Sequence, residues 1–238
     1  MMFLEARPAR PPSPAIQAIV AACFMALPTS PGAEPFHCLD SQVVVLAEAR
    51  IDQERVCASV ASSKFVLETL GLKPIGDGVI TIELRQVLRA SNGSPAIGQC
   101  HDPSKRIEIL AYDAAVAASM KYPAAFGVPM SKALWDSYVV HEFAHATAQA
   151  HFAAGVPMST ASEYIAAVAQ MISLPPALRE QILANYGTTT GFERDSEITE
   201  LFYYMDPAKF AVMAYRHYLK PENGARFVGR LLRHGLPN

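Results

Sequence analysis

The stretch from residue 132 to 154 constrains the fold of this chain more than any other segment. It is rich in alanine and contains no glycine or proline, and Ser131 before it and Gly155 after it are typical helix boundaries. We therefore predict one long helix here. Its apolar side chains would bury most of its surface, yet its middle reads His141-Glu142-Phe143-Ala144-His145. Two histidines and a glutamate inside a buried helix are costly unless they have partners.

The spacing of these residues indicates a metal as the partner. Side chains four residues apart return to nearly the same helix face, about 40° round and one turn along. Two imidazoles placed in this way, His141 and His145, can bind one Zn²⁺ ion. Glu142 is rotated by about 100°, so it would lie beside the metal as a general base. The alternative is a pair of core histidines bonded to backbone or carboxylates, with Glu142 in solvent.

A catalytic zinc site also needs a third protein ligand and an open position. Glu163 lies eighteen residues after His145, near the start of the next predicted helix. An antiparallel return of that helix would bring Glu163 opposite the two histidines. His151 is the alternative, because its spacing fits the pattern HExxHxxGxxH. However, Ala148 occupies the glycine position, and a helix that continues past it would turn His151 away from the metal.

The remaining pattern predicts an α+β fold in one domain. A mixed sheet-and-helix half (34–130) would precede the central active-site helix (131–154) and a helical half (155–238), with a cleft between the halves. Predicted strands cover 43–46 and 79–84, and a hairpin pairs 97–100 with 106–110. Predicted helices cover 53–70, capped by Asp52, and 111–120, 161–173, 177–186, 195–205, 208–219 and 222–233.

The N-terminal segment has the pattern of a secretory signal peptide over residues 1–33. Arg7 and Arg10 precede an apolar run at 15–27, and helix-breaking prolines and small residues follow. The run is shorter than the roughly 20 residues that a bilayer span needs, so we expect no stable membrane span. We predict an exported protein, periplasmic or secreted, with a mature chain from about residue 34.

Composition and cysteines add two further expectations. The net charge of −2 and the lack of a basic cluster argue against a nucleic-acid partner. Export to an oxidising compartment permits a disulfide among Cys38, Cys57 and Cys100, and the sequence does not choose the pair. Any such bridge would lie in the N-terminal half.

An HExxH motif with a helical glutamate some eighteen residues later resembles the gluzincin clan of zinc peptidases. His141, Glu142, His145 and Glu163 match the motifs of that clan position by position. The segments HEFAHA and SEYIAAVAQ also resemble a group of uncharacterised exported bacterial proteins with such a site. The resemblance implies a zincin-like fold and a zinc hydrolase that acts on a peptide or protein substrate, in which Glu142 activates a metal-bound water.

The chain departs from the clan at two points. Many gluzincins carry an aspartate four residues after the ligand glutamate, where this chain has Ala167, and the exopeptidase signature is absent. We therefore carry over the zinc site and the hydrolytic class, but no aminopeptidase specificity. Two alternatives stay open: a non-catalytic zinc-binding envelope protein with a zincin fold, and a metzincin-like site that uses His151. Candidates for the oxyanion donor are Tyr203, Tyr204, Tyr215 and His217.

Overall fold

A mixed five-stranded sheet and a group of helices make up the part of the chain that the computed structural model describes. The predicted α+β class is therefore confirmed. The signal peptide predicted over 1–33 lies outside the described residues, and no helix within them is long and apolar enough to cross a membrane. The described residues are 34–39, 41–73, 78–90, 93–101, 104–121 and 125–236.

Three parallel strands form the centre of the sheet and an antiparallel strand forms each edge. The order is β1-β2-β3-β5-β4, in which β2, β3 and β5 run parallel. The predicted strands and hairpin are confirmed to within one or two residues. The strands are β1 (Phe36–His37), β2 (Val43–Leu46), β3 (Ile80–Arg85), β4 (Gly98–His101) and β5 (Arg106–Leu110).

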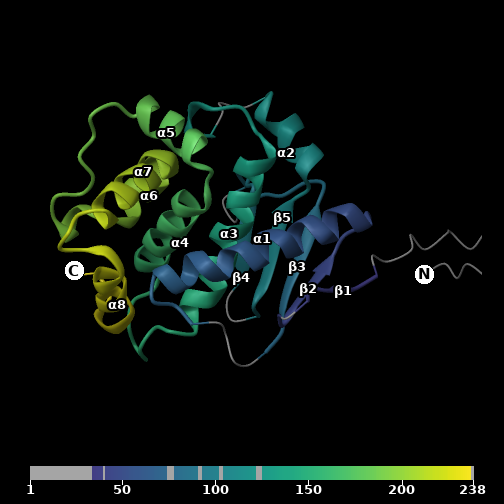
Figure 1. Ribbon diagram of the computed structural model, residues 1–238, viewed down its shortest axis with the longest axis horizontal. Coiled ribbons are helices and arrows are strands. Elements are labelled where there is room, and N and C mark those ends of the chain that lie inside the picture. Colours follow the sequence, from purple (N-terminus) through teal and green to yellow (C-terminus); the bar gives the residue numbers. More distant parts are fainter. Residues whose placement is uncertain are drawn as a thin grey trace, which may run out of the picture. The chain divides into compact units, whose positions relative to one another are not determined.

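Beyond β5 the described chain is helical, as predicted (Figure 1). The helix predicted over 195–205 is interrupted, because the Thr199 hydroxyl accepts a hydrogen bond from the amide of Phe202 and starts a new helix. The helices are α1 (Arg50–Thr69), α2 (Tyr112–Ser119), α3 (Lys132–Gln149), α4 (Ser159–Ser173), α5 (Pro176–Asn185), α6 (Glu200–Met205), α7 (Pro207–Tyr218) and α8 (Gly224–His234), with 3₁₀ turns η1 (Ala125–Gly127) and η2 (Asp195–Glu197).

Two further helix boundaries differ from the predictions by more than two residues. Helix α1 starts before Asp52, at Arg50, with Ala49 as its N-cap. Helix α3 ends at Gln149, although the pattern predicted helix to Ala154. The end of α3 is fixed by His151, whose amide donates to the carbonyl of Ala148 and whose ring bonds to a carbonyl one residue earlier. These bonds satisfy carbonyls that a longer helix would use, and so they close the last turn.

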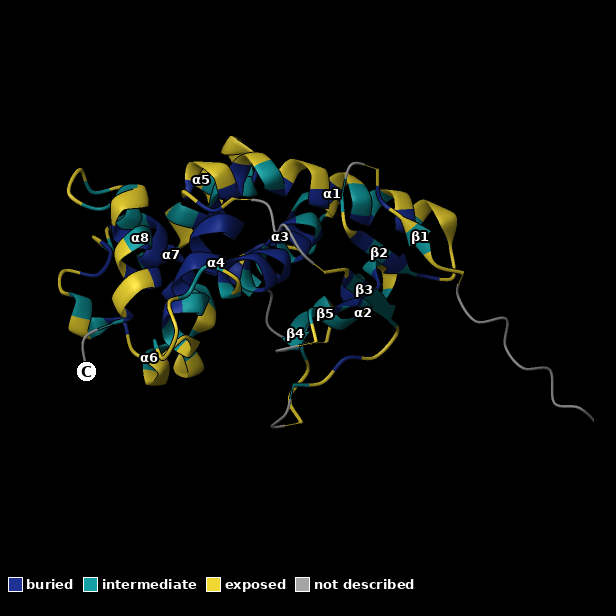
Figure 2. Cartoon of the chain, turned by 90° about the horizontal axis from the view of Figure 1, so that it is seen from below, coloured by how far each residue is buried: buried dark blue, intermediate teal, exposed yellow. Residues whose placement is uncertain are grey.

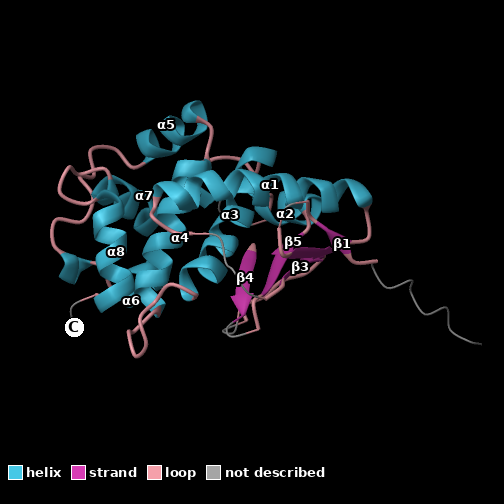
Figure 3. Cartoon of the chain, turned by 60° about the horizontal axis from the view of Figure 1, so that its bottom comes forward, coloured by secondary structure: helices cyan, strands magenta, loops and turns pink. Residues whose placement is uncertain are grey.

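Helices α1 and α3 pack against one face of the sheet. Alternate residues of β2, β3 and β5 are buried beneath them, as the two-residue repeat of a strand requires. Helix α4 packs beside α3, and α7 packs on α4. Figure 2 shows α3 and α4 as the most buried helices, and Figure 3 shows helices α4 to α8 gathered to one side of the strands. Helix α3 is therefore the element that joins the sheet to the helical half.

A disulfide between Cys38 and Cys57 ties the turn after β1 to helix α1. The expectation that a bridge would lie in the N-terminal half is confirmed, and the structure supplies the pair that the sequence left open. The third cysteine, Cys100, lies in β4 and stays outside the bridge.

Removal of this bridge should destabilise the protein. The bonded residues are 19 apart, and closing a loop of that size stabilises a fold by roughly 3 kcal/mol. We expect the double variant Cys38→Ala/Cys57→Ala to melt roughly 5–10 °C lower than the wild type, measured by circular dichroism. A reductant should lower the melting temperature of the wild type and leave that of the variant unchanged. Equal melting temperatures for the two oxidised proteins would contradict the role of the bridge.

Candidate metal centre

Helix α3 is anchored at its start, which fixes where its histidines point. The Ser131 hydroxyl accepts a hydrogen bond from the amide of Leu134, 3.2 Å away, so Ser131 is the N-cap that the sequence predicted. One turn on, the indole of Trp135 donates to the carbonyl of Leu110 at the end of β5, at 2.8 Å. Trp135 has no exposed surface. These contacts hold α3 in one position against the sheet.

Helix α4 runs antiparallel to α3, and two polar contacts set its register. Near the start of α3, the amide of Gln170 donates to the hydroxyl of Ser137 at 3.3 Å. Further along α3, the imidazole of His145 is 2.7 Å from the hydroxyl of Ser162. The antiparallel return predicted from the sequence is therefore confirmed. It places Glu163, next to Ser162, opposite the two histidines.

Three donor atoms converge between the two helices. The Nε2 atoms of His141 and His145 are 3.1 Å apart. The Oε2 atom of Glu163 lies 3.6 Å from the first and 3.4 Å from the second. Donors held tetrahedrally at roughly 2.0–2.1 Å from one metal ion would lie about 3.3 Å from each other. His141, His145 and Glu163 are thus brought together with the spacing of a metal site.

The ligand oxygen of Glu163 lacks any other partner. Among the described residues, Oε2 is a buried atom without a hydrogen bond, which is unfavourable for a carboxylate. Burial alone would raise the pKa of Glu163, but the two histidines outweigh it and hold that pKa well below its usual range. An ionised carboxylate with an unpaired oxygen aimed at two imidazoles is a suitable ligand for a metal cation.

The two histidines are held differently. Ser162 bonds to Nδ1 of His145, which leaves Nε2 facing the other donors, a common arrangement for a metal ligand. In contrast, Nδ1 of His141 is buried and has no hydrogen-bond partner within the described part of the chain. At the position where many gluzincins carry an aspartate that bonds to a zinc-binding histidine, Ala167 offers no side-chain acceptor. The sequence did not identify a residue that replaces this contact. In the structure Ser162 supplies it, but to His145 alone.

Glu142 lies beside the three donors, against strand β4. Its side chain is 6 % exposed, and its carboxylate accepts a hydrogen bond from the backbone amide of Cys100. Burial raises the pKa of Glu142 to about 7; His141 and the Cys100 amide oppose this, and Glu163 adds to it. The alternative interpretation of His141 and His145 as core histidines expected Glu142 in solvent. The burial of Glu142 does not fit that alternative.

Gly98 makes room for Glu142. A Cβ atom at residue 98 would lie 2.5 Å from Oε1 and 2.6 Å from Cγ of Glu142, closer than any stable contact. Gly98 does not have a positive φ, so its backbone conformation does not require glycine. The requirement comes from Glu142 alone. Sequence reasoning missed both Gly98 and Ser162; the one available signal was that Gly98 lies inside a predicted strand (97–100), where glycine is unfavourable.

A cleft of about 600 Å³ gives access to the site, in agreement with the predicted cleft between the halves. Gly98, His141, Glu142 and Tyr203 are among its lining residues. The hydroxyl of Tyr203 interacts with the carboxylate of Glu163. Burial and the charges of Glu163 and Glu142 raise the pKa of Tyr203 above its usual value, so its hydroxyl remains a donor. Of the four oxyanion candidates, Tyr203 is the one that contacts a ligand residue.

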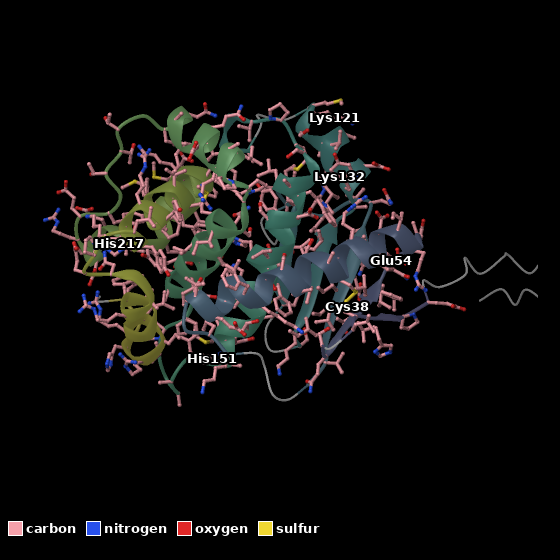
Figure 4. The ribbon with its side chains drawn as sticks, viewed as in Figure 1. Cys38, Glu54, Lys121, Lys132, His151 and His217 are labelled. Atoms are coloured by element: carbon pink, nitrogen blue, oxygen red, sulfur yellow. A yellow bond between two sulfur atoms is a disulfide. The ribbon has the colours of Figure 1, made fainter. Side chains whose placement is uncertain are left out.

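The other candidates lie elsewhere or face solvent. Tyr204 lines the cleft, but it is 68 % exposed. Tyr215 is buried under Arg179, and His217 bonds through Nδ1 to the hydroxyl of Tyr164 at 2.8 Å. His151, just beyond α3, bonds to the carbonyl of Thr147 and the amide of Lys73. Figure 4 shows His217 among the C-terminal helices and His151 well apart from it.

His151 therefore has partners of its own and does not join the three donors. The sequence also predicted that His151 would lie away from the metal, but it did so from a helix that continues to Ala154. That reason was wrong, because α3 ends at Gln149. Among the described residues, the group that could hold a metal ion consists of His141, His145 and Glu163.

Comparison with known proteins gives a family but no activity. The sequence model described as "Family of unknown function (DUF6639)" matches residues 43–236, so the chain belongs to that family. The matched region contains the whole metal centre, the cleft and every strand of the sheet except β1. No curated protein and no solved structure matches the chain. Its function must therefore be argued from the site.

Metal analysis tests the three ligands. Purified protein dialysed against a divalent metal should retain about one ion per chain, and His145→Ala or Glu163→Ala should retain far less, because two donors seldom hold a catalytic metal. His151→Ala is the matched control and should bind like the wild type. If Glu163→Ala kept its metal while His151→Ala lost it, the assignment of the third ligand would be overturned.

Proposed function

We propose that this member of the family is an exported zinc-dependent hydrolase, a metallopeptidase with a gluzincin-like site in a zincin-like fold. The observation that carries the proposal is the convergence of three donor atoms, 3.1–3.6 Å apart, at the wall of an open cleft. Glu142 adds a buried carboxylate beside them. A hydrolase that uses an activated water needs this combination of metal ligands, base and substrate access.

The donor set favours zinc. Two imidazoles and one carboxylate form a typical three-ligand catalytic zinc site. The same set also holds iron in some oxygenases. Here the two histidines are four residues apart on one helix, and a further glutamate that is not a ligand lies between them, which is the arrangement of zinc hydrolases.

The number of ligands favours a catalytic site over a structural one. Structural zinc sites are closed by four protein ligands, whereas catalytic sites keep a position for water or substrate. The group found among the described residues has three members, and it borders the cleft. A non-catalytic zinc-binding protein would also have no use for a buried base such as Glu142.

Each residue of the site has a place in peptide hydrolysis. Zinc bound there would polarise the substrate carbonyl and lower the pKa of a water. Glu142 accepts the proton of the attacking water and returns it to the leaving amine. Tyr203 lines the cleft with its hydroxyl protonated, and by turning that hydroxyl away from Glu163 it would donate a hydrogen bond to the oxyanion. Ser162 keeps His145 in the orientation that binds the metal.

The disulfide supports the proposed location. Bridges such as Cys38–Cys57 form and persist in oxidising compartments, including the periplasm and the extracellular medium. This agrees with the signal peptide predicted over residues 1–33. A periplasmic or secreted peptidase would meet peptides or proteins as its substrates.

Replacement of the base tests the proposed function. Glu142→Gln should keep its zinc, because residue 142 is not a ligand, and should lose turnover of a peptide library roughly 100-fold or more, measured by mass spectrometry of the products. Glu68→Gln, on the exposed face of α1, is the matched control and should cleave normally. A wild-type protein that binds zinc and cleaves no peptide would favour the non-catalytic alternative.

A second variant tests how the base is positioned. Gly98→Ala should retain zinc and lower kcat roughly tenfold or more, because the new methyl group displaces the Glu142 carboxylate. Gly229→Ala on α8 is the control, since the nearest atom to its Cβ is the mobile end of Arg233.

The double variant Gly98→Ala/Glu142→Ala separates this effect from general damage. Alanine lacks the Cγ, Cδ and carboxylate atoms that the new methyl group would meet. Gly98→Ala should therefore lower the melting temperature of the wild type more than that of the Glu142→Ala protein, measured by circular dichroism. Equal losses in both backgrounds would show that residue 98 acts in some other way.

A further inference from the structure

A second cavity, of about 570 Å³, opens next to the metal cleft. It lies between helix α2 and two segments of the β3–β4 connection, 86–89 and 95–97. Its size is that of pockets that enclose a large part of a small ligand. Nothing in the metal site requires it, because none of the three metal ligands, nor Glu142, lines it.

The lining of this cavity is mainly apolar. Leu88, Leu110 and Met130 are among its lining residues, and Leu88 and Leu110 are buried. Helix α2 contributes alanines, of which Ala117 is exposed. These short side chains leave the space open. Further lining residues are polar or charged: Gln86, Arg89, Ser119 and Lys121.

The apolar cavity and the metal cleft are neighbours. Both are lined by the segment 95–97 and by Ala125. This segment leads directly into Gly98, the residue that contacts Glu142. A chain bound along the metal cleft past Gly98 would therefore reach the apolar cavity within a few residues.

The shared wall is held in place by the backbone. The amide of Ala96 donates to the carbonyl of Leu88 at 3.1 Å, and the carbonyl of Ile97 accepts from the amide of Leu110 at 2.7 Å. Because both ends of the wall are bonded to neighbouring strands or their extensions, the cavity is preformed. A preformed site binds without an ordering cost in the protein.

From these observations, which rest on the proposed function, we propose that the cavity binds a large apolar side chain of the peptide substrate. That residue would lie a few positions from the bond that is cleaved. The occupant is a peptide and not a separate small molecule because the cavity shares part of its lining with the cleft that the reacting groups border. Apolar side chains gain free energy in proportion to the surface they remove from water, so this cavity selects substrates by hydrophobicity.

A substitution at the mouth of the cavity tests the inference. Ala117→Trp fills the opening from an exposed position on α2, and Ala61→Trp on the exposed face of α1 is the matched control. Both changes are made in zinc-loaded Glu142→Gln protein, which should bind peptides without cleaving them. Each protein is incubated with a library of short synthetic peptides, and the retained peptides are sequenced by mass spectrometry.

We expect peptides with a large apolar residue at one position to be enriched by the Glu142→Gln protein. Ala117→Trp should weaken their binding roughly tenfold, and Ala61→Trp should leave it unchanged. The inference is overturned if no apolar position is enriched, or if Ala117→Trp keeps the same preference.

The cleavage assay separates this result from the proposed function. Pocket-dependent binding by the Glu142→Gln protein, with no cleavage by the wild type, would keep the cavity as a peptide site and reject the peptidase. Cleavage by the wild type with a product pattern that Ala117→Trp does not alter would keep the peptidase and reject the cavity as a subsite.

Discussion

The antiparallel contact between α3 and α4 is the constraint on which the site depends. Helix α3 alone offers two histidines, and α4 alone offers a glutamate in its first turns. Only the register set by the Ser162–His145 and Gln170–Ser137 contacts brings the three donor atoms within bonding distance of one ion. Since α3 is also the helix that packs on the sheet, a shift of α4 along α3 would separate the ligands while leaving the rest of the fold in place.

The sheet completes the site from the other side. Strand β4 is an edge strand, and its first residue, Gly98, lies against Glu142 while the amide of Cys100 bonds to the Glu142 carboxylate. The Glu142 carboxylate is therefore positioned by β4, and the three candidate metal ligands by α3 and α4. This division explains why the sheet-and-helix half and the helical half are both needed around the cleft, and why the cleft lies along the edge of the sheet.

Local features of the site followed from the sequence, and long-range ones did not. The four-residue spacing of His141 and His145 determines their common face on any helix, and the apolar flanks made the helix itself predictable. The return of Glu163 required only a short connection between two helices. By contrast, the contact of Gly98 with Glu142 joins residues 44 apart, and nothing in the strand pattern reveals it. The disulfide pair likewise depends on a tertiary contact.

The two glutamates of the site have different surroundings, which shift the pKa of one carboxylate down and that of the other up. Glu163 faces two imidazoles, which hold its pKa low despite burial, so it is an anion suited to bind a cation. Glu142 is more deeply buried, and burial raises its pKa to about 7, the range in which a carboxylate both accepts and releases a proton. A structural metal site would need only the first of these environments. The second has a cost in stability, because a carboxylate is desolvated without a full set of partners, and a proton-transfer role gives that cost a function.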